Sequence, residues 1–199
     1  MSMFTRLLVV FAAAVGLFTL AAPALPESAS VQTDRAPGLT LEAIDDTRLD
    51  RLGDVFAQRD VHVVCPSSGE WALSPVASVA WGYVRIPSGQ QTGMRINALA
   101  CVGAVAVANR DLSVPAWQRA LGVQVLVHES YHLRRWGSAG NEAKVECQAI
   151  RHFKVAVRLL GGTPTDADEL WPYALAAYWR LARLAPGYYD PSCKVHWYW

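Results

Sequence analysis

Two histidines four residues apart, His128 and His132, constrain the fold of this chain more than any other feature. Side chains at this spacing project from the same face of an α-helix, so both imidazoles can reach one metal ion if the segment is helical. Glu129 follows the first histidine directly, which places its carboxylate within reach of a water bound to that metal. The segment His128-Glu129-Ser130-Tyr131-His132 therefore predicts a helix that carries a zinc site, with Glu129 as the general base of a hydrolase.

The residues around the two histidines also have the spacing of a helix. Ser113-Val114-Pro115 is typical of a helix start, and Gly137 is typical of a helix end. Between them, one face of the predicted helix carries Leu121, Val125, His128 and His132. The helical setting that the metal site needs is thus predicted by residues other than the histidines themselves.

Two carboxylates at the start of the next predicted helix are candidates for the third metal ligand. Glu142 and Glu146 are four residues apart, so they share a helix face. One can bind the metal while the other accepts a hydrogen bond from a ligand histidine and fixes its orientation. The alternative is an ordinary solvated helix start, where acidic residues interact favourably with the helix dipole.

The segment His128–His132, followed by Asn141-Glu142-Ala143 and Glu146, resembles the gluzincin clan of zinc metallopeptidases, of which thermolysin is a member. The resemblance covers about residues 113 to 160. It implies that His128, His132 and Glu142 bind one zinc ion per chain. It also implies that Glu129 is the general base and that Glu146 supports a histidine ligand. An exchange of roles between Glu142 and Glu146 stays open, and the motif that supplies a histidine to the transition state in large members is not evident.

The N-terminal residues have the pattern of a targeting segment. Arg6 precedes an unbroken apolar run from Leu7 to Leu20, and Ala22-Pro23-Ala24 is typical of a signal peptidase site. The run is short for a membrane span, although a retained anchor is the alternative. We expect a signal peptide over residues 1–24, a flexible spacer or propeptide over 25–40, and one metallohydrolase domain over 41–199.

All four cysteines lie beyond the predicted leader, an even number that indicates a disulfide framework in an oxidising compartment. No two of them have the close spacing of a cysteine zinc site. We favour pairing within each half of the chain, with buried free thiols as the alternative. The favoured disulfides join Cys65 to Cys101 and Cys147 to Cys193.

Apolar periodicity and turn residues predict an α+β fold. Strands are expected over Val61–Cys65, Val79–Ile86 and Met94–Ala100. Helices are expected near 46–56, 113–137, 141–160 and 166–185, and the apolar segment Cys101–Ala108 fits either a strand or a helix. Together with the resemblance, the pattern predicts a zincin-like domain in which a small, mostly antiparallel sheet precedes three helices, two of which carry the metal site.

The charge balance argues against two classes of partner. Arg6 is the single basic residue of the predicted leader, which leaves 17 basic against 17 acidic residues. A chain of balanced charge does not capture nucleic acid or an anionic membrane surface electrostatically. Because of the predicted signal peptide we expect a secreted or extracytoplasmic protein, and no later segment is long and apolar enough to span a bilayer.

The predicted function is peptide-bond hydrolysis by an exported zinc metalloprotease. The strand Met94–Ala100 precedes the metal helix and is the expected edge for an extended peptide or protein substrate. Two alternatives stay open: a non-catalytic binding or scaffold protein that retains the zinc site, and a zinc hydrolase that acts on another bond. The tyrosines that can donate a hydrogen bond to an oxyanion are Tyr178, Tyr188 and Tyr189, and the histidines expected to lie away from the metal are His152 and His196.

Overall fold

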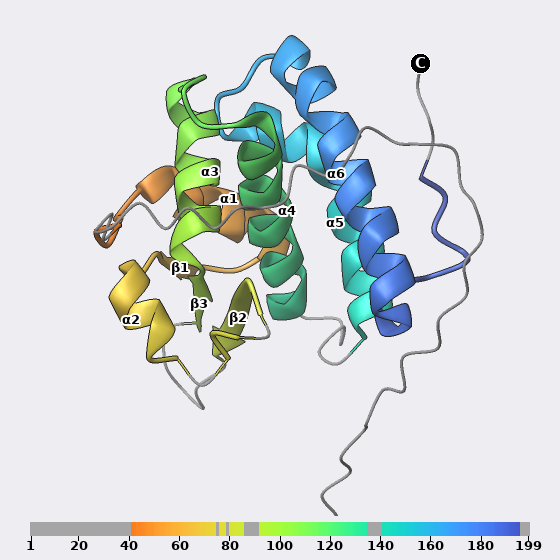
Figure 1. The fold of residues 1–199 in the computed structure, drawn as a ribbon, viewed down its shortest axis with the longest axis horizontal. Coiled ribbons are helices and arrows are strands. Elements are labelled where there is room, and N and C mark those ends of the chain that lie inside the picture. Colours follow the sequence, from red (N-terminus) through yellow and green to blue (C-terminus); the bar gives the residue numbers. More distant parts are fainter. Residues whose placement is uncertain (1–40, 75, 79, 86–91, 135–140, 196–199) are drawn as a thin grey trace, which may run out of the picture. The chain divides into compact units, whose positions relative to one another are not determined.

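Helices make up most of the described part of the chain, which comprises residues 41–74, 76–78, 80–85, 92–134 and 141–195 of the computed structural model (Figure 1). The helices are α1 (Thr47–Ala57), α2 (Ser68–Ala72), α3 (Ala98–Asn109), α4 (Ala116–Leu133), α5 (Glu142–Leu159) and α6 (Pro164–Leu184), followed by the 3-10 turn η1 (Pro186–Tyr188). The strands are β1 (Val61–Val64), β2 (Gly82–Arg85) and β3 (Thr92–Ile96). The fold class is α+β, as predicted. The predicted signal peptide and spacer lie outside the described residues.

The sheet is mixed and has the strand order β1-β3-β2. Strand β3 pairs parallel with β1 and antiparallel with β2, so Met94 lies opposite Val63 on one side and Val84 on the other. The prediction of a mostly antiparallel sheet is therefore wrong for one of the two pairs. The chain passes through α2 and β2 before β3 enters the sheet, and a connection of this length allows β3 to run in the same direction as β1.

The position of β3 also corrects the expected substrate edge. The sequence predicts a free strand edge at Met94–Ala100, but β3 is the central strand and is paired on both sides. Strand β2 is an edge of the sheet and packs against α4. The sheet edge next to α4 is therefore β2.

A side-chain cap separates strand β3 from helix α3. The predicted strand Met94–Ala100 ends at Ile96, because the Asn97 side chain accepts a hydrogen bond from the Leu99 N–H and begins a helix there. The ambiguous segment Cys101–Ala108 continues this helix. Local hydrogen bonding thus decides a boundary that apolar character alone leaves open.

Helix α2 lies between the first two predicted strands, where the sequence predicts neither a helix nor a strand. Ser67 and Glu70 form a capping box, in which each side chain accepts a hydrogen bond from the other residue's backbone N–H. The next predicted strand, Val79–Ile86, is shorter in the structure, where β2 covers Gly82–Arg85. Positions 79 and 86 lie outside the described residues.

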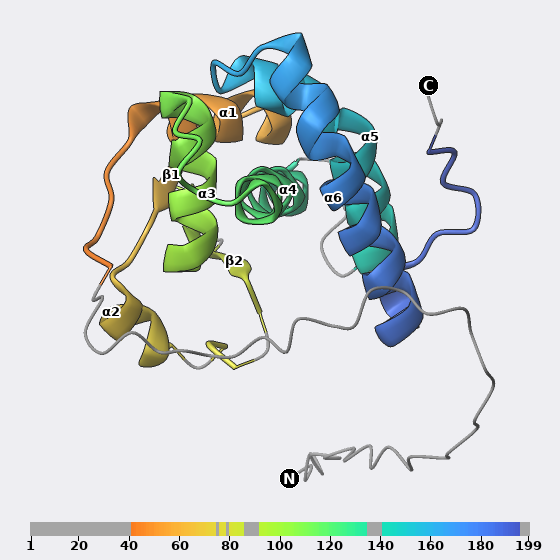
Figure 2. The same cartoon turned by 45° about the horizontal axis from the view of Figure 1, so that its top comes forward.

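Helix α4 lies at the centre of the helical part of the molecule. Figure 2 shows it end-on, with α3 and α1 on one side and α5 and α6 on the other, and all four pack against it. Gly103 and Gly122 allow α3 and α4 to approach closely, since a Cβ on Gly122 would lie 2.3 Å from the Ala100 carbonyl oxygen. The helix that carries both histidines is therefore held by neighbours on nearly every face.

The structure contains the two disulfides that the sequence favours, Cys65–Cys101 and Cys147–Cys193. The first joins the end of β1 to α3, and the second joins α5 to the segment that follows η1. Two disulfides suggest a location outside the cytoplasm. None of the described helices has the length and apolar character that crossing a membrane requires.

Candidate metal centre

Helices α4 and α5 bring two imidazoles and one carboxylate together. His128 and His132 lie one turn apart on α4, and their Nε2 atoms are 3.0 Å from each other. The Glu142 Oε2 atom lies 3.2 Å from His128 Nε2 and 3.3 Å from His132 Nε2. Asn141 caps α5 by accepting a hydrogen bond from the Lys144 N–H, which places Glu142 in the first turn of that helix. These three side chains form a group that can hold a metal ion.

A buried chain of hydrogen bonds orients the ring of His128. Its Nδ1 atom lies 2.7 Å from Glu146 Oε2, and the other carboxylate oxygen of Glu146 accepts a hydrogen bond from the Gln124 side-chain amide. Glu146 and Gln124 are only 3% and 6% exposed. Because a carboxylate on Nδ1 keeps the hydrogen on that nitrogen, the Nε2 lone pair is left for a cation.

Glu129 is buried beside this group and lies against strand β2. Gly82 comes so close that a Cβ at that position would be 2.7 Å from Glu129 Cγ. Burial raises the pKa of the Glu129 carboxyl to about 7, with the charge of His128 opposing the rise and the charges of Glu142 and Glu146 adding to it. A carboxyl with this pKa can both accept and release a proton near neutral pH.

The carboxylates also set the protonation of the two imidazoles. Burial disfavours the charged form of His128, but hydrogen bonds with Glu142 and Glu146 outweigh burial and raise its pKa to about 10. Burial and the neighbouring charge of His128 lower the pKa of His132, while the hydrogen bond with His128 lowers the pKa of Glu142. The carboxylates therefore favour positive charge at this place, which a divalent cation bound by the same atoms would supply.

The other candidate histidine that the structure describes lies away from the group, as expected. His152 Nδ1 is 3.0 Å from the Tyr131 hydroxyl and 2.9 Å from the Gln148 carbonyl oxygen, one turn earlier on α5. His196 lies outside the described residues.

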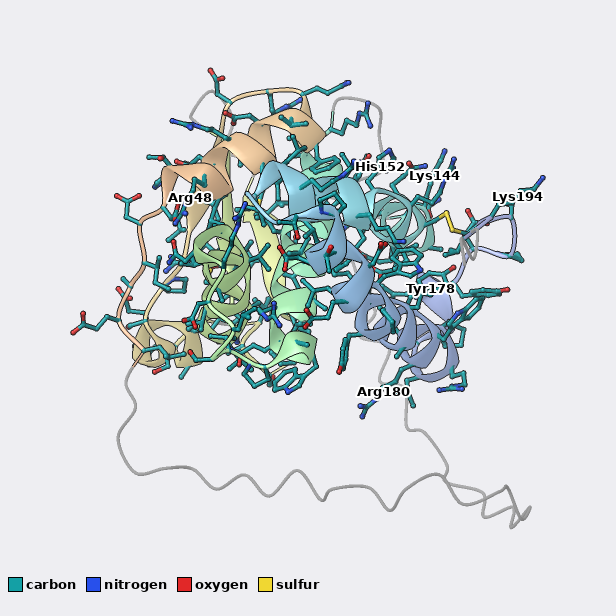
Figure 3. All side chains as sticks on the ribbon, turned by 90° about the horizontal axis from the view of Figure 1, so that it is seen from above. Arg48, Lys144, His152, Tyr178, Arg180 and Lys194 are labelled. Atoms are coloured by element: carbon teal, nitrogen blue, oxygen red, sulfur yellow. A yellow bond between two sulfur atoms is a disulfide. The ribbon has the colours of Figure 1, made fainter. Side chains whose placement is uncertain are left out.

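The three candidate tyrosines have different surroundings. Tyr178 is 1% exposed in the core (Figure 3), which agrees with a packing role. Tyr189 is exposed and packs against Trp179. Tyr188 stacks on the ring of His128, with ring centroids 6.0 Å apart, so it is the tyrosine of the three that lies at the candidate metal site.

Sequence reasoning missed two residues that shape the site. Gln124 lies four residues before His128 on the same helix face, so its spacing could have identified it as a partner of the ligand helix. Gly82 carried no such signal, because its contact with Glu129 depends on how β2 packs against α4.

Comparison of the chain with protein-family models, with curated proteins and with solved structures finds no match in any of the three.

Proposed function

We propose that this protein is an exported zinc metallopeptidase with a gluzincin-like site. The observation that carries the proposal is the convergence of His128, His132 and Glu142 beside the buried carboxyl of Glu129. Glu146 lies on the second nitrogen of His128 rather than among the converging atoms, which supports Glu142 as the third ligand and Glu146 as its hydrogen-bonding support. This distribution of roles is the one that the resemblance implies.

The spacing of the three donor atoms suits zinc. In tetrahedral zinc sites the ligand nitrogens and oxygens lie about 2.0–2.1 Å from the ion, so neighbouring ligand atoms are about 3.3–3.4 Å apart. The three separations among His128 Nε2, His132 Nε2 and Glu142 Oε2 are 3.0, 3.2 and 3.3 Å. Two imidazoles and one carboxylate are also a donor set of catalytic zinc sites, which keep a fourth position for water.

Each residue of the site has its own role in the proposed hydrolysis. Zinc, when bound, makes water a nucleophile at neutral pH and polarises the scissile carbonyl. Glu129 accepts the proton of the attacking water on its carboxylate and then delivers that proton to the leaving amine. Glu146 and Gln124 hold the His128 ring in the orientation that presents Nε2 to the ion.

Strand β2 is the proposed docking edge for the substrate. Among the described residues it pairs only with β3, so its other edge is available to an extended peptide. Gly82 brings the β2 backbone against Glu129. A peptide added to this edge would therefore run past the proposed general base.

The test is zinc content and proteolysis in matched variants of the purified protein. We expect about one zinc per chain by elemental analysis and cleavage of an unstructured protein by the wild type. Glu129→Gln should keep zinc but lower kcat by about 10²–10⁴-fold, since it removes the proton acceptor. His132→Ala should lose zinc. Glu42→Gln is the matched control, because Glu42 is an exposed carboxylate, and it should leave both measurements unchanged.

Each failure has its own meaning. A wild-type protein without zinc would refute the metal site and the function together. Zinc without cleavage of any peptide would indicate the non-catalytic binding or scaffold protein. Zinc with cleavage only of non-peptide bonds would indicate another zinc hydrolase.

A further inference from the structure

The turn after the last long helix places an aromatic ring over the metal group. Tyr188 ends η1, where its backbone N–H donates to the Ala185 carbonyl at 2.9 Å. Its ring lies nearly parallel to that of His128, with an angle of 24° between the planes. Tyr188, which lies 60 positions after His128 in the sequence, is thus part of the wall of the site.

The surroundings of the Tyr188 hydroxyl are those of a hydrogen-bond donor. The carboxylates of Glu142, Glu129 and Glu146 are the charged groups near the phenol. A tyrosine hydroxyl carries its hydrogen at neutral pH, so it can donate to an oxygen bound beside these groups.

A disulfide holds the segment that carries Tyr188 on the helix that carries Glu142. Cys193 lies five residues after Tyr188, and its partner Cys147 lies five residues after Glu142 on α5. Figure 3 shows this disulfide between α5, near Lys144, and the C-terminal segment that carries Lys194. Turn η1 itself packs against both α5 and α6. Tyr188 is thereby fixed relative to a metal ligand, as a preorganised donor has to be.

We propose that the Tyr188 hydroxyl donates a hydrogen bond to the oxygen of the scissile carbonyl as negative charge develops on it. The inference rests on the proposed peptide hydrolysis and supplies the electrophilic partner that the sequence left unassigned. Donors placed where charge develops act mainly on the transition state, so Tyr188 contributes to kcat more than to KM. No covalent bond to Tyr188 forms, and its proton stays on the phenol oxygen.

The experiment compares Tyr188→Phe with Tyr189→Phe, which removes the neighbouring hydroxyl from an exposed ring. We expect Tyr188→Phe to lower kcat by about 10²-fold with KM within about threefold of the wild type, and Tyr189→Phe to change neither. Zinc affinity should be the same in all three proteins. A second measurement is the binding of a phosphinic analogue of the best cleaved peptide, which carries negative charge at the same position and should bind Tyr188→Phe at least tenfold more weakly.

The outcomes separate this inference from the proposed function. If the wild type cleaves peptides and Tyr188→Phe matches it in kcat and in phosphinate binding, the inference is wrong and the function stands. Equal losses in the two tyrosine variants, or a loss of zinc in Tyr188→Phe, would mean that the ring is structural and would also overturn it. A wild type that cleaves no peptide overturns both.

Discussion

At the residue scale, the candidate site consists of common side chains whose proposed roles depend on which atoms each one contacts. The two ring nitrogens of His128 have different neighbours, because Glu146 contacts Nδ1 while Glu142 and His132 approach Nε2. Both carboxylates come from one face of α5, one turn apart. The difference between the proposed ligand Glu142 and its proposed support Glu146 therefore comes from which nitrogen of His128 each carboxylate contacts.

This difference predicts that replacing Glu142 or Glu146 with glutamine has distinct effects on zinc binding. Glu146→Gln removes the negative charge that makes the His128 ring a better ligand, so zinc affinity should fall by about 10–100-fold. Glu142→Gln removes a ligand oxygen charge and should weaken zinc binding more than Glu146→Gln does. Competition with a chelating dye measures both affinities. If Glu146→Gln loses zinc while Glu142→Gln keeps it, the two residues have exchanged roles.

Much of this residue pattern was available from the sequence, and the rest depends on packing. The spacings of His128, His132, Glu142 and Glu146 predict shared helix faces, and the structure places those faces opposite each other. The nearness of Gly82 to Glu129 and of Tyr188 to His128 joins segments far apart in the chain. Spacing rules cover a few turns of one helix, so they could not select Tyr188 from the three candidate tyrosines.

At the element scale, α4 holds the two candidate ligands in a fixed position because α3 packs directly against its backbone. A Cβ on Gly122 would lie 2.3 Å from both the Ala100 oxygen and the Ala104 nitrogen. These neighbours are backbone atoms within a helix, so they cannot move aside as a flexible side chain would. Accommodating a larger residue would require the two helices to separate.

Gly122→Ala should therefore destabilise the protein, although alanine is the better helix former. Overpacking costs about 1–3 kcal/mol of unfolding free energy, and a clash with backbone atoms belongs at the upper end of this range. The cost therefore exceeds the roughly 1 kcal/mol that alanine gains in helix propensity. Gly69→Ala is the control, because a Cβ added to Gly69 on α2 would meet no atom within 4 Å, and this variant should be neutral or stabilising. Urea unfolding measures both. Equal midpoints for the two variants would contradict a rigid α3–α4 contact.

The same contact explains why the sequence leaves α3 unassigned. A segment apolar on every face fits a buried strand as well as a buried helix, and most of Cys101–Ala108 is buried. By contrast, α1, α5 and α6 each have one exposed face that shows the helical period. All four helices begin at a capping side chain, which is Asp46 for α1, Asn97 for α3, Asn141 for α5 and Thr163 for α6. Elements with a boundary signal and a polar face were predicted well, whereas the pairing direction of β3 depended on a long connection that has no local signal.

At the scale of the whole molecule, the two disulfides close loops of similar length but hold different parts of the chain, one in the core and the other at its C-terminal end. Their cysteines are 36 and 46 residues apart, for which loop entropy gives about 4 kcal/mol of stabilisation in either case. Cys65 and Cys101 are 2% and 0% exposed within the core. Cys193 is partly exposed and follows the last helix, so opening its disulfide frees the end of the chain without opening the core.

Mild reduction of the native protein should therefore open Cys147–Cys193 well before Cys65–Cys101, because thiol exchange requires access to a sulfur. Alkylation followed by mass spectrometry should label Cys147 and Cys193 first and reach the other pair only when the protein unfolds. The stability lost in this first step should be smaller than the loop entropy suggests, since the released segment gains freedom in the folded state as well. Simultaneous labelling of all four cysteines would show that the two disulfides belong to one cooperative unit.

If Tyr188 acts as proposed, the selectively reduced protein should keep its zinc and lose kcat toward the level of Tyr188→Phe, because the same disulfide that is dispensable for the core holds the donor over the site.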